Sequence, residues 1–326
     1  MCPPGYSVLV SMLRIIYRVG QILYGLAAGK PMGLSDMNDV DGITSAALFK
    51  RTRPDAVVVL AYPPEVKKGV LIRRVYWDFV ADLPCPGKAR FRADHHETNK
   101  PCADKEYYDP EAPASALLAM RGLGLEGDPV AEALVKVAVE TDTARIESRE
   151  AELLDAAVKG AGYRGRLYLV ERLAREGLKV IDDPRVQGWI ERHMEVKRRT
   201  EEMAQRLPVR KEEYVLFEKD LGLSYRYLSI LLERRGAEFT FIVVPKPFFS
   251  YRIYAGARSE SQRDAAVIAR RLGGGGHKYA AGALVRAFPR SRALRLIVEE
   301  LRGYTGYEKI PFIVVDGRGE FREEEF

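Results

Sequence analysis

Two adjacent histidines follow an aspartate in the segment Asp94-His95-His96, in a chain that contains only four histidines. Imidazole binds divalent transition metals and donates hydrogen bonds to phosphate oxygens, so this pair indicates a chemical site. A structural histidine pair on a loop is the alternative for the segment taken alone. Acidic residues elsewhere in the chain favour the chemical interpretation.

Upstream of the histidines, Asp39 and Asp41 stand two residues apart, next to Gly42 and ahead of a helical apolar pattern. This spacing predicts a strand-to-helix corner. In extended backbone, residues i and i+2 point to the same side, so both carboxylates can face one metal cluster. A helix N-cap with a neighbouring surface acid is the alternative.

Two further aspartates stand at the ends of predicted elements. Asp78 ends the strand-like run 71–77, and Asp142 ends the helical run 130–141. Carboxylates at such positions are commonly helix caps. Each of the two is therefore a candidate metal ligand only in combination with the other acids.

In this order and spacing, the motifs resemble the DHH phosphoesterases, a superfamily that includes RecJ-type exonucleases, nano-RNases, cyclic-dinucleotide phosphodiesterases and family II pyrophosphatases. The resemblance, to an archaeal member, implies two bound manganese ions, with magnesium as the other option. Carried onto this chain, the implied metal ligands are Asp39, Asp41, Asp78, His95 and Asp142. The same resemblance places Asp94 and His96 in catalysis, with His96 facing the substrate phosphate.

A run of four glycines, Gly273–Gly276, precedes His277 and Lys278 in the second half of the chain. Glycines permit positive φ and bring backbone N–H groups close to an anion, and the two side chains add donors. A flexible connector is the alternative. The string resembles the GGGGH and AAG signature of the C-terminal substrate domain in many DHH proteins. That resemblance implies a substrate site made by Arg258, Gly274, Gly275, Gly276 and His277.

One position departs from the family pattern. Family members usually have a histidine two or four residues before the first corner aspartate, or an aspartate at the nearer place, where this chain has Met37 and Ser35. A thioether is a poor ligand for a hard ion such as manganese. Either one metal site is incomplete, or Asp36 substitutes from a shifted position. The other ligand types are retained, so we favour a working or modified site.

Strand-like runs at 56–61, 75–77 and 89–92 alternate with helical patterns, which predicts an α/β fold with a mostly parallel sheet. A charged helical segment at 186–207 predicts an interdomain helix, followed by a smaller α/β domain. The expected organisation is a helical extension at 1–29, a metal-binding DHH domain at 30–183, a linker helix at 184–208 and a substrate-binding domain at 209–326.

The three cysteines, Cys2, Cys85 and Cys102, include no CxxC pair and are odd in number. They therefore indicate neither a disulfide framework nor a zinc knuckle, and we expect a reducing, cytoplasmic compartment. The formal net charge of +6 favours a polyanionic substrate, with a generic basic surface as the alternative. The few asparagines and glutamines resemble thermophile usage.

Two apolar segments have open interpretations. Residues 8–28 are mostly apolar, but Arg14 and Arg18 interrupt them, so we expect a packing or partner helix and neither a membrane span nor a secretory signal. Met12 is an alternative start. In the segment Lys246–Phe249, the aromatic pair predicts core packing, with base stacking as the alternative.

The expected function is that of a manganese-dependent phosphodiesterase or exonuclease acting on single-stranded DNA or RNA or on short oligonucleotides. A catalytically weak nucleic-acid-binding or replication subunit is the alternative, and Met37 favours it. An inorganic pyrophosphatase is a third hypothesis, which the glycine run disfavours. The sequence leaves open a homodimer or a replication or repair partner.

Overall fold

The computed structural model describes residues 6–326, with side chains from residue 12 onward. The chain divides into two compact units, one of residues 8–194 and one containing residues 195–326. The division falls at Glu195, inside the long helix α9 (Pro184–Arg206). This helix spans the segment that was predicted to join two domains. The domain boundaries themselves stay a prediction.

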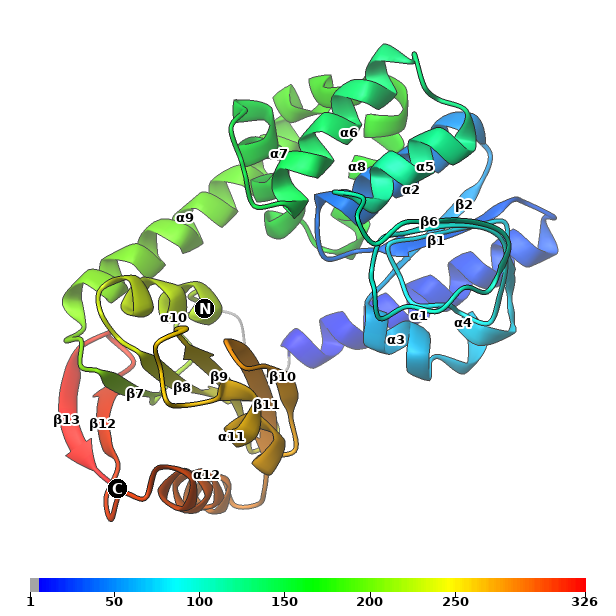
Figure 1. Cartoon of the computed structure of the whole chain (residues 1–326). Helices are drawn as coiled ribbons and strands as arrows, with labels where there is room; N and C mark the ends of the chain where they lie inside the picture. Colours follow the sequence, from blue (N-terminus) through cyan, green and yellow to red (C-terminus); the bar gives the residue numbers. More distant parts are fainter. Residues whose placement is uncertain (1–5) are drawn as a thin grey trace. The chain divides into compact units, whose positions relative to one another are not determined.

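Figure 1 shows the sheet of the N-terminal unit with helices on both of its sides. The strand order of this sheet is β2-β1-β4-β5-β3, with β6 paired to β5, and every pairing is parallel. Its strands are β1 (Met32–Asp36), β2 (Val57–Ala61), β3 (Tyr76–Trp77), β4 (Phe79–Ala81), β5 (Lys88–Asp94) and β6 (Ala103–Tyr108). Parallel strands end at one edge of a sheet, where this topology commonly places ligands. Asp36 and Asp94, which end β1 and β5, and Asp82, which follows β4, therefore share that edge.

Helices cover both faces of this sheet. Residues of α2, α5, α6, α7 and α8 form one apolar core against it, and Ile22, Val66 and Ile72 of α1, α3 and α4 belong to a second core on the other face. The helical elements are α1 (Tyr6–Ala27), α2 (Val40–Thr52), α3 (Pro63–Lys68), α4 (Val70–Arg74), α5 (Ser115–Leu123), α6 (Pro129–Asp142), α7 (Arg149–Gly160), α8 (Tyr163–Glu176) and the 3-10 turn η1 (Gly177–Asp182). Burial on both faces explains the apolar, β-branched sequence of β2.

Helix α1 packs on the sheet along one side only. Ile22 is buried, and the Gln21 side chain donates to the Val58 carbonyl at 2.8 Å. Arg14 and Arg18 both pair with Glu65 of α3. No helix among the described residues is long and apolar enough to cross a membrane.

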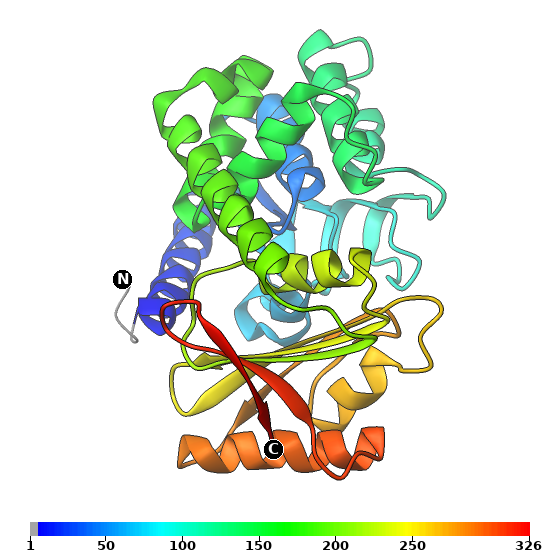
Figure 2. The ribbon, with the colours of Figure 1, turned by 90° about the vertical axis from the view of Figure 1, so that its left-hand side faces the viewer.

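The sheet of the C-terminal unit is mixed, in the order β10-β11-β9-β8-β7-β12-β13. Its strands are β7 (Glu212–Phe217), β8 (Phe239–Lys246), β9 (Ser250–Ala257), β10 (Gly275–His277), β11 (Ala280–Arg286), β12 (Pro311–Val315) and β13 (Phe321–Glu325). Helix α10 (Tyr225–Arg234) covers one face, and α11 (Ala265–Arg271) and α12 (Arg290–Thr305) cover the other (Figure 2). The expected α/β fold, with a parallel N-terminal sheet and a smaller C-terminal α/β unit, is confirmed.

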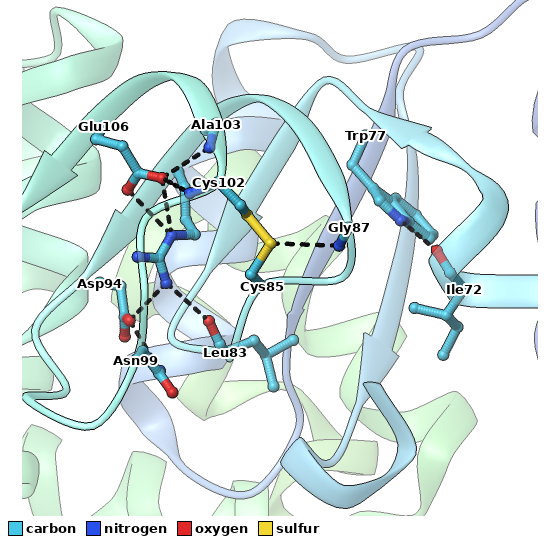
Figure 3. Close-up of a disulfide and its surroundings, with 11 residues drawn as sticks. Ile72, Trp77, Leu83, Cys85, Gly87, Asp94, Asn99, Cys102, Ala103 and Glu106 are labelled. Carbon is cyan, nitrogen blue, oxygen red and sulfur yellow. Dashed lines mark hydrogen bonds and ion pairs between the residues drawn. A yellow bond between two sulfur atoms is a disulfide. The ribbon is translucent and has the colours of Figure 1, made fainter. Parts of the chain in front are cut away.

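A disulfide joins Cys85 to Cys102, with an S–S distance of 2.14 Å (Figure 3). The sequence pattern indicated no disulfide framework, so this bond corrects that interpretation. The two residues are 17 positions apart, but Cys85 precedes β5 and Cys102 precedes β6, and these strands are neighbours. The pairing therefore arises from sheet topology, which cysteine spacing alone does not reveal.

The aromatic pair Phe248 and Phe249 is also placed differently from expectation. Both lie in the turn between β8 and β9, with 52% and 47% of their surface exposed. The prediction that they belong to the core was wrong, because the strand ends at Lys246 and the turn points them into solvent.

Candidate metal centre

The corner between β1 and α2 brings three acids together. Asp36 ends the strand, Asp39 caps the helix by accepting from the Gly42 N–H, and Asp41 lies in the first helical turn. A Cβ at position 42 would lie 2.4 Å from the Asp36 carbonyl oxygen, so only glycine lets the chain turn this closely. The capping role proposed as the alternative for Asp39 and its place in an acidic cluster are thus both present.

Asp41 is fully buried and faces the start of α5. Its two carboxylate oxygens accept from the Ser115 and Ala116 N–H groups, each at 2.7 Å. First-turn N–H groups of a helix have no partner inside the helix and favour negative charge nearby. The two bonds fix the orientation of the carboxylate.

His95 links three of the acids. Its Nε2 lies 4.0 Å from Asp41 Oδ2, 3.8 Å from Asp82 Oδ1 and 3.5 Å from Asp142 Oδ2. The other ring nitrogen, Nδ1, lies 3.0 Å from the Ala112 carbonyl oxygen. A carbonyl accepts only, so Nδ1 carries a proton, and Nε2 is the ring nitrogen that faces the acids and could bind a metal ion, the arrangement usual for a metal-bound histidine.

The potential ligand atoms form three overlapping groups, within each of which they lie no more than 4.8 Å apart. These groups are Asp41, His95 and Asp142; Asp36, Asp39 and Asp82; and Asp82, His95 and His96. Asp82 belongs to two of them and so connects the two ends of the cluster.

The acids of the cluster raise one another's pKa values. Burial, followed by the charges of Asp142 and Asp39, raises the pKa of Asp41. Burial and the Asp41 charge raise the pKa of Asp82 well above its ordinary range, and burial and the Asp39 charge raise that of Asp36 to about 6. Among the described side chains, no lysine or arginine pairs with any of these four residues or with Asp142. Buried carboxylates in such a group either take up protons or bind a cation, and a divalent metal ion would supply the positive charge that the described lysines and arginines do not.

Asp78, predicted as a ligand, is not brought to the cluster. Its Oδ2 accepts from the Met32 N–H at 2.9 Å, and its Oδ1 lies 3.6 Å from Arg90 Nη1. Met32 begins β1, whereas the cluster lies where β1 ends, so Asp78 sits at the opposite edge of the sheet.

Asp82 is the strand-end acid at the cluster, and the sequence interpretation missed it. It follows the three-residue strand β4, and its φ is +57°. Positive φ is uncommon outside glycine, although Asp adopts it more readily than most residues, and such conformations gather at functional sites. The available signal was the short apolar run 79–81 that precedes Asp82.

Met37 takes no part in the cluster. Its side chain is buried in the core between the sheet and α2. Asp36 instead lies with Asp39 and Asp82, and it is held there by the Met37 N–H at 2.6 Å and by the Asn38 amide at 3.1 Å. The structure thus brings Asp36 to the cluster, and its role as a substitute ligand stays a prediction.

Asp94 orients His96. Asp94 Oδ1 lies 3.0 Å from His96 Nδ1, and this hydrogen bond raises the pKa of the imidazole. Asp94 Oδ2 accepts from Arg92 and from the Asn99 amide, each at 2.8 Å (Figure 3). Arg92 also donates to Glu106. The sequence interpretation did not identify Arg92, Asn99 or Glu106 as part of this network.

The glycine run of the C-terminal unit forms a β-hairpin edge and not a loose connector. Residues 275–277 pair antiparallel with residues 280–282. A Cβ at Gly274 would lie 2.1 Å from the Gly282 carbonyl oxygen, and Gly276 has φ +140°. His277 and Arg258 are exposed, and Arg258 Nε lies 3.4 Å from Glu260. These residues therefore lie on an ordered and accessible part of their unit.

Solved structures share the architecture of this chain. A pGpG-specific phosphodiesterase, PggH from Vibrio cholerae, superposes with a TM-score of 0.61 at 18% identity, over 83% of this chain and 99% of that one. The DHH domain of a member of a family of ribosomal proteins gives 0.54 at 14% identity, over 88% and 92%. The chain has the DHH fold. An exonuclease RecJ bound to manganese has the same DHH fold and gives 0.51 at 16% identity, over 89% and 94%.

The DHH fold agrees with the resemblance seen in the sequence. No protein-family model matches the chain, and no curated protein is similar to it in sequence. The likeness is therefore one of architecture.

Proposed function

We propose that this chain is a divalent-metal-dependent phosphodiesterase that hydrolyses single-stranded nucleic acid or short oligonucleotides. One observation carries the proposal: five aspartates and His95 converge at one edge of the parallel sheet, and no lysine or arginine among the described residues pairs with these aspartates. The fold neighbours that include a pGpG phosphodiesterase and a manganese-bound exonuclease support it. Carboxylate oxygens with one imidazole suit manganese, and magnesium is the other option.

The ligand groups divide between two ions. Asp41, His95 and Asp142 would hold one, and Asp36, Asp39 and Asp82 the other. This set replaces Asp78 of the sequence prediction by Asp82 and adds Asp36. When bound, two divalent ions supply an activated water and stabilise the attacking and leaving oxygens of an in-line displacement.

His96 is proposed to contact the phosphoryl oxygens. Its side chain is 48% exposed, and its Nδ1 is engaged by Asp94, which leaves Nε2 for the substrate. Because Asp94 is fully buried and bonded to Arg92 and Asn99, it holds the imidazole in one orientation. A pre-oriented donor loses little freedom when the phosphate binds.

In the C-terminal unit, Arg258, His277 and the glycines Gly274, Gly275 and Gly276 are proposed to bind a neighbouring phosphate or base. The Gly274 N–H already donates to the Ala269 carbonyl at 2.7 Å, so Gly274 contributes through its close backbone approach and not as a donor. Glycine at 274 and 276 lets the hairpin backbone lie close to its partner strand, where a side chain would collide. Exposed backbone N–H groups with a nearby guanidinium form a general anion site.

A nuclease assay tests the proposal. Purified protein is incubated with manganese and 5′- or 3′-labelled DNA, RNA and dinucleotides, and product ladders are read. We expect cleavage by the parent, none by Asp41→Ala or His95→Ala, and retained folding of both variants by circular dichroism. Parental rates in either variant would refute the assignment.

A catalytically weak binding subunit is the second candidate, and Met37 favours it because the residue replaces a family ligand with a core side chain. A manganese titration with labelled single-stranded oligonucleotide separates the two: tight binding without products identifies the subunit. Phosphate release from pyrophosphate tests the pyrophosphatase alternative in the same samples.

A further inference from the structure

Three exposed phenylalanines gather at one end of β9 and β11. Phe248 and Phe249 lie in the turn before β9, and Phe288 follows β11. Their exposed fractions are 52%, 47% and 72%, and the rings of Phe249 and Phe288 meet edge to face with centroids 4.8 Å apart. Isolated exposed apolar residues are ordinary, but a cluster of large aromatic ones marks a binding surface.

The backbone fixes these rings on the outside. Phe248 and Phe249 have φ values of +59° and +54°, a region that aromatic residues rarely adopt. The Ala287 N–H donates to the Phe249 carbonyl at 3.2 Å, and Arg290 donates to the Lys246 carbonyl at 3.1 Å. The turn is thus tied to the segment after β11, and its strained conformation serves no core packing.

The segment of the chain that carries the phenylalanines is rich in basic residues. Residues 239–298 contain 11 Lys and Arg but only two acids, Glu260 and Asp264. Arg252, Arg286 and Arg290 are exposed, and within the described part of the chain none of them forms an ion pair. Aromatic rings among unneutralised arginines fit the bases and phosphates of nucleic acid.

A continuous strand connects this surface to the glycine hairpin. In β11, Gly282 lies beside Gly275 of the hairpin, Leu284 lies opposite Arg252, and Arg286 lies opposite Ser250. From Gly282 to Phe288 the chain covers about 20 Å at the usual rise per strand residue. A single strand of several nucleotides spans that distance.

We propose that Phe248, Phe249 and Phe288, with Arg252, Arg286 and Arg290, form a binding site for single-stranded nucleic acid several nucleotides away from the glycine hairpin. Bases stack on the rings, and the guanidinium groups bind the phosphates between them. The site makes the preferred substrate a strand of several nucleotides and not a dinucleotide. This inference rests on the proposed function in one respect: the end of the nucleic acid strand is assigned to the glycine hairpin.

Binding measurements test this site without hydrolysis. Fluorescence anisotropy is recorded for the full chain in EDTA with a fluorescein-labelled oligothymidylate 12-mer and with the dinucleotide. Phe248→Ala and Phe288→Ala should each weaken 12-mer binding by about tenfold or more and leave dinucleotide binding unchanged. The matched control is Phe321→Ala, which removes a 40%-exposed phenylalanine from β13, at the opposite end of the strand order. The control should bind both ligands as the parent does.

A reporter variant tests stacking directly. In Phe288→Trp, the 12-mer should quench the new indole fluorescence, and the dinucleotide should not. Equal 12-mer affinity for the parent and both alanine variants, or no binding of the 12-mer at all, would overturn the proposal. Phenylalanine-dependent binding without cleavage in manganese would instead count against the proposed hydrolysis and leave this site standing.

Discussion

Arg92 Nη1 lies 2.8 Å from Asp94 Oδ2, and both side chains are fully buried. The same guanidinium donates to Glu106 at 3.0 Å and to the Leu83 carbonyl at 3.3 Å. Leu83 follows Asp82, and Asp94 precedes His95, so one arginine ties together two loops that carry proposed metal ligands.

Replacing Arg92 with Met should therefore destabilise the protein strongly. Asp94 and Glu106 would lose their buried counter-charge, which costs about 3–5 kcal/mol when one partner of a buried pair is removed. Urea unfolding followed by circular dichroism measures the loss. Arg92→Lys is the control that keeps the charge but not the three-way geometry, and it should fall between the parent and Met. A Met variant as stable as the parent would show that the pair contributes nothing.

Asp82→Asn and Asp78→Asn form a matched pair for the metal assignment. We expect Asp82→Asn to lower hydrolysis by more than about a hundredfold, since even residues behind the ligands cost 10–100-fold. Asp78→Asn should hydrolyse at the parental level, because the amide oxygen can still accept from the Met32 N–H. Calorimetric manganese titration gives a second readout. The opposite ranking would restore Asp78 as the ligand.

The disulfide should contribute about 3 kcal/mol to stability, because Cys85 and Cys102 close a loop of 17 residues. Dithiothreitol should lower the urea midpoint of the parent. The double variant Cys85→Ser with Cys102→Ser should begin at the lowered midpoint and show no further response to the reductant. A reductant-insensitive parent contradicts this prediction.

Glu213 should make stability depend on pH. Burial raises its pKa from 4.5 to about 7, and its Oε1 has no hydrogen-bond partner. A group with a raised folded pKa contributes stability that is present below its unfolded pKa and is lost as pH rises through the folded value. Relative to Glu213→Gln, the parent should therefore lose unfolding free energy between pH 4.5 and 7, by up to about 1.4 kcal/mol per pH unit. The free energy of unfolding is measured from urea curves at four pH values. The same change with pH in both proteins would show that Glu213 does not cause the pH dependence.

Gly274→Ala should disturb the glycine hairpin, whereas Gly275→Ala should not. The added Cβ at 274 would meet the Gly282 carbonyl oxygen at 2.1 Å, but nothing lies within 4 Å of one at 275. We expect weaker oligonucleotide binding only in the first variant, measured by anisotropy. Equal affinities would remove the hairpin geometry from the proposed substrate site.

Local patterns predicted much of the site, and spatial relations account for what they missed. The corner acids Asp39 and Asp41 and the pair His95 and His96 could be recognised because their chemistry lies within a few consecutive residues. Asp82 could not, because β3 and β4 are two short strands separated only by Asp78, and either could precede the ligand.

Long-range pairing explains the other differences. Cys85 and Cys102 meet because adjacent strands bring their loops together. From the sequence alone, Arg92 would be predicted to lie on the surface, because it is a charged residue in a strand of alternating polarity. Its burial depends on Glu106, which lies opposite it on the neighbouring strand. Exposure of Phe248 depends on where a turn points, which hydrophobicity does not encode.

Helix α1 has a consequence for handling the protein. Arg14 and Arg18 are the charged residues of its described part, and both pair with Glu65. From residue 12 onward its exposed surface, which includes Ile16 and Leu23, is therefore largely apolar. Shortening the chain to begin at Lys30 would remove that surface. It would also remove Ile22, which packs in the same buried cluster as Met32 and Val59 of the sheet. Truncation would thus replace one exposed apolar surface, on the helix, with another, on the sheet. Replacing Ile16 and Leu23 by polar residues would reduce the exposed apolar surface and keep the helix in place.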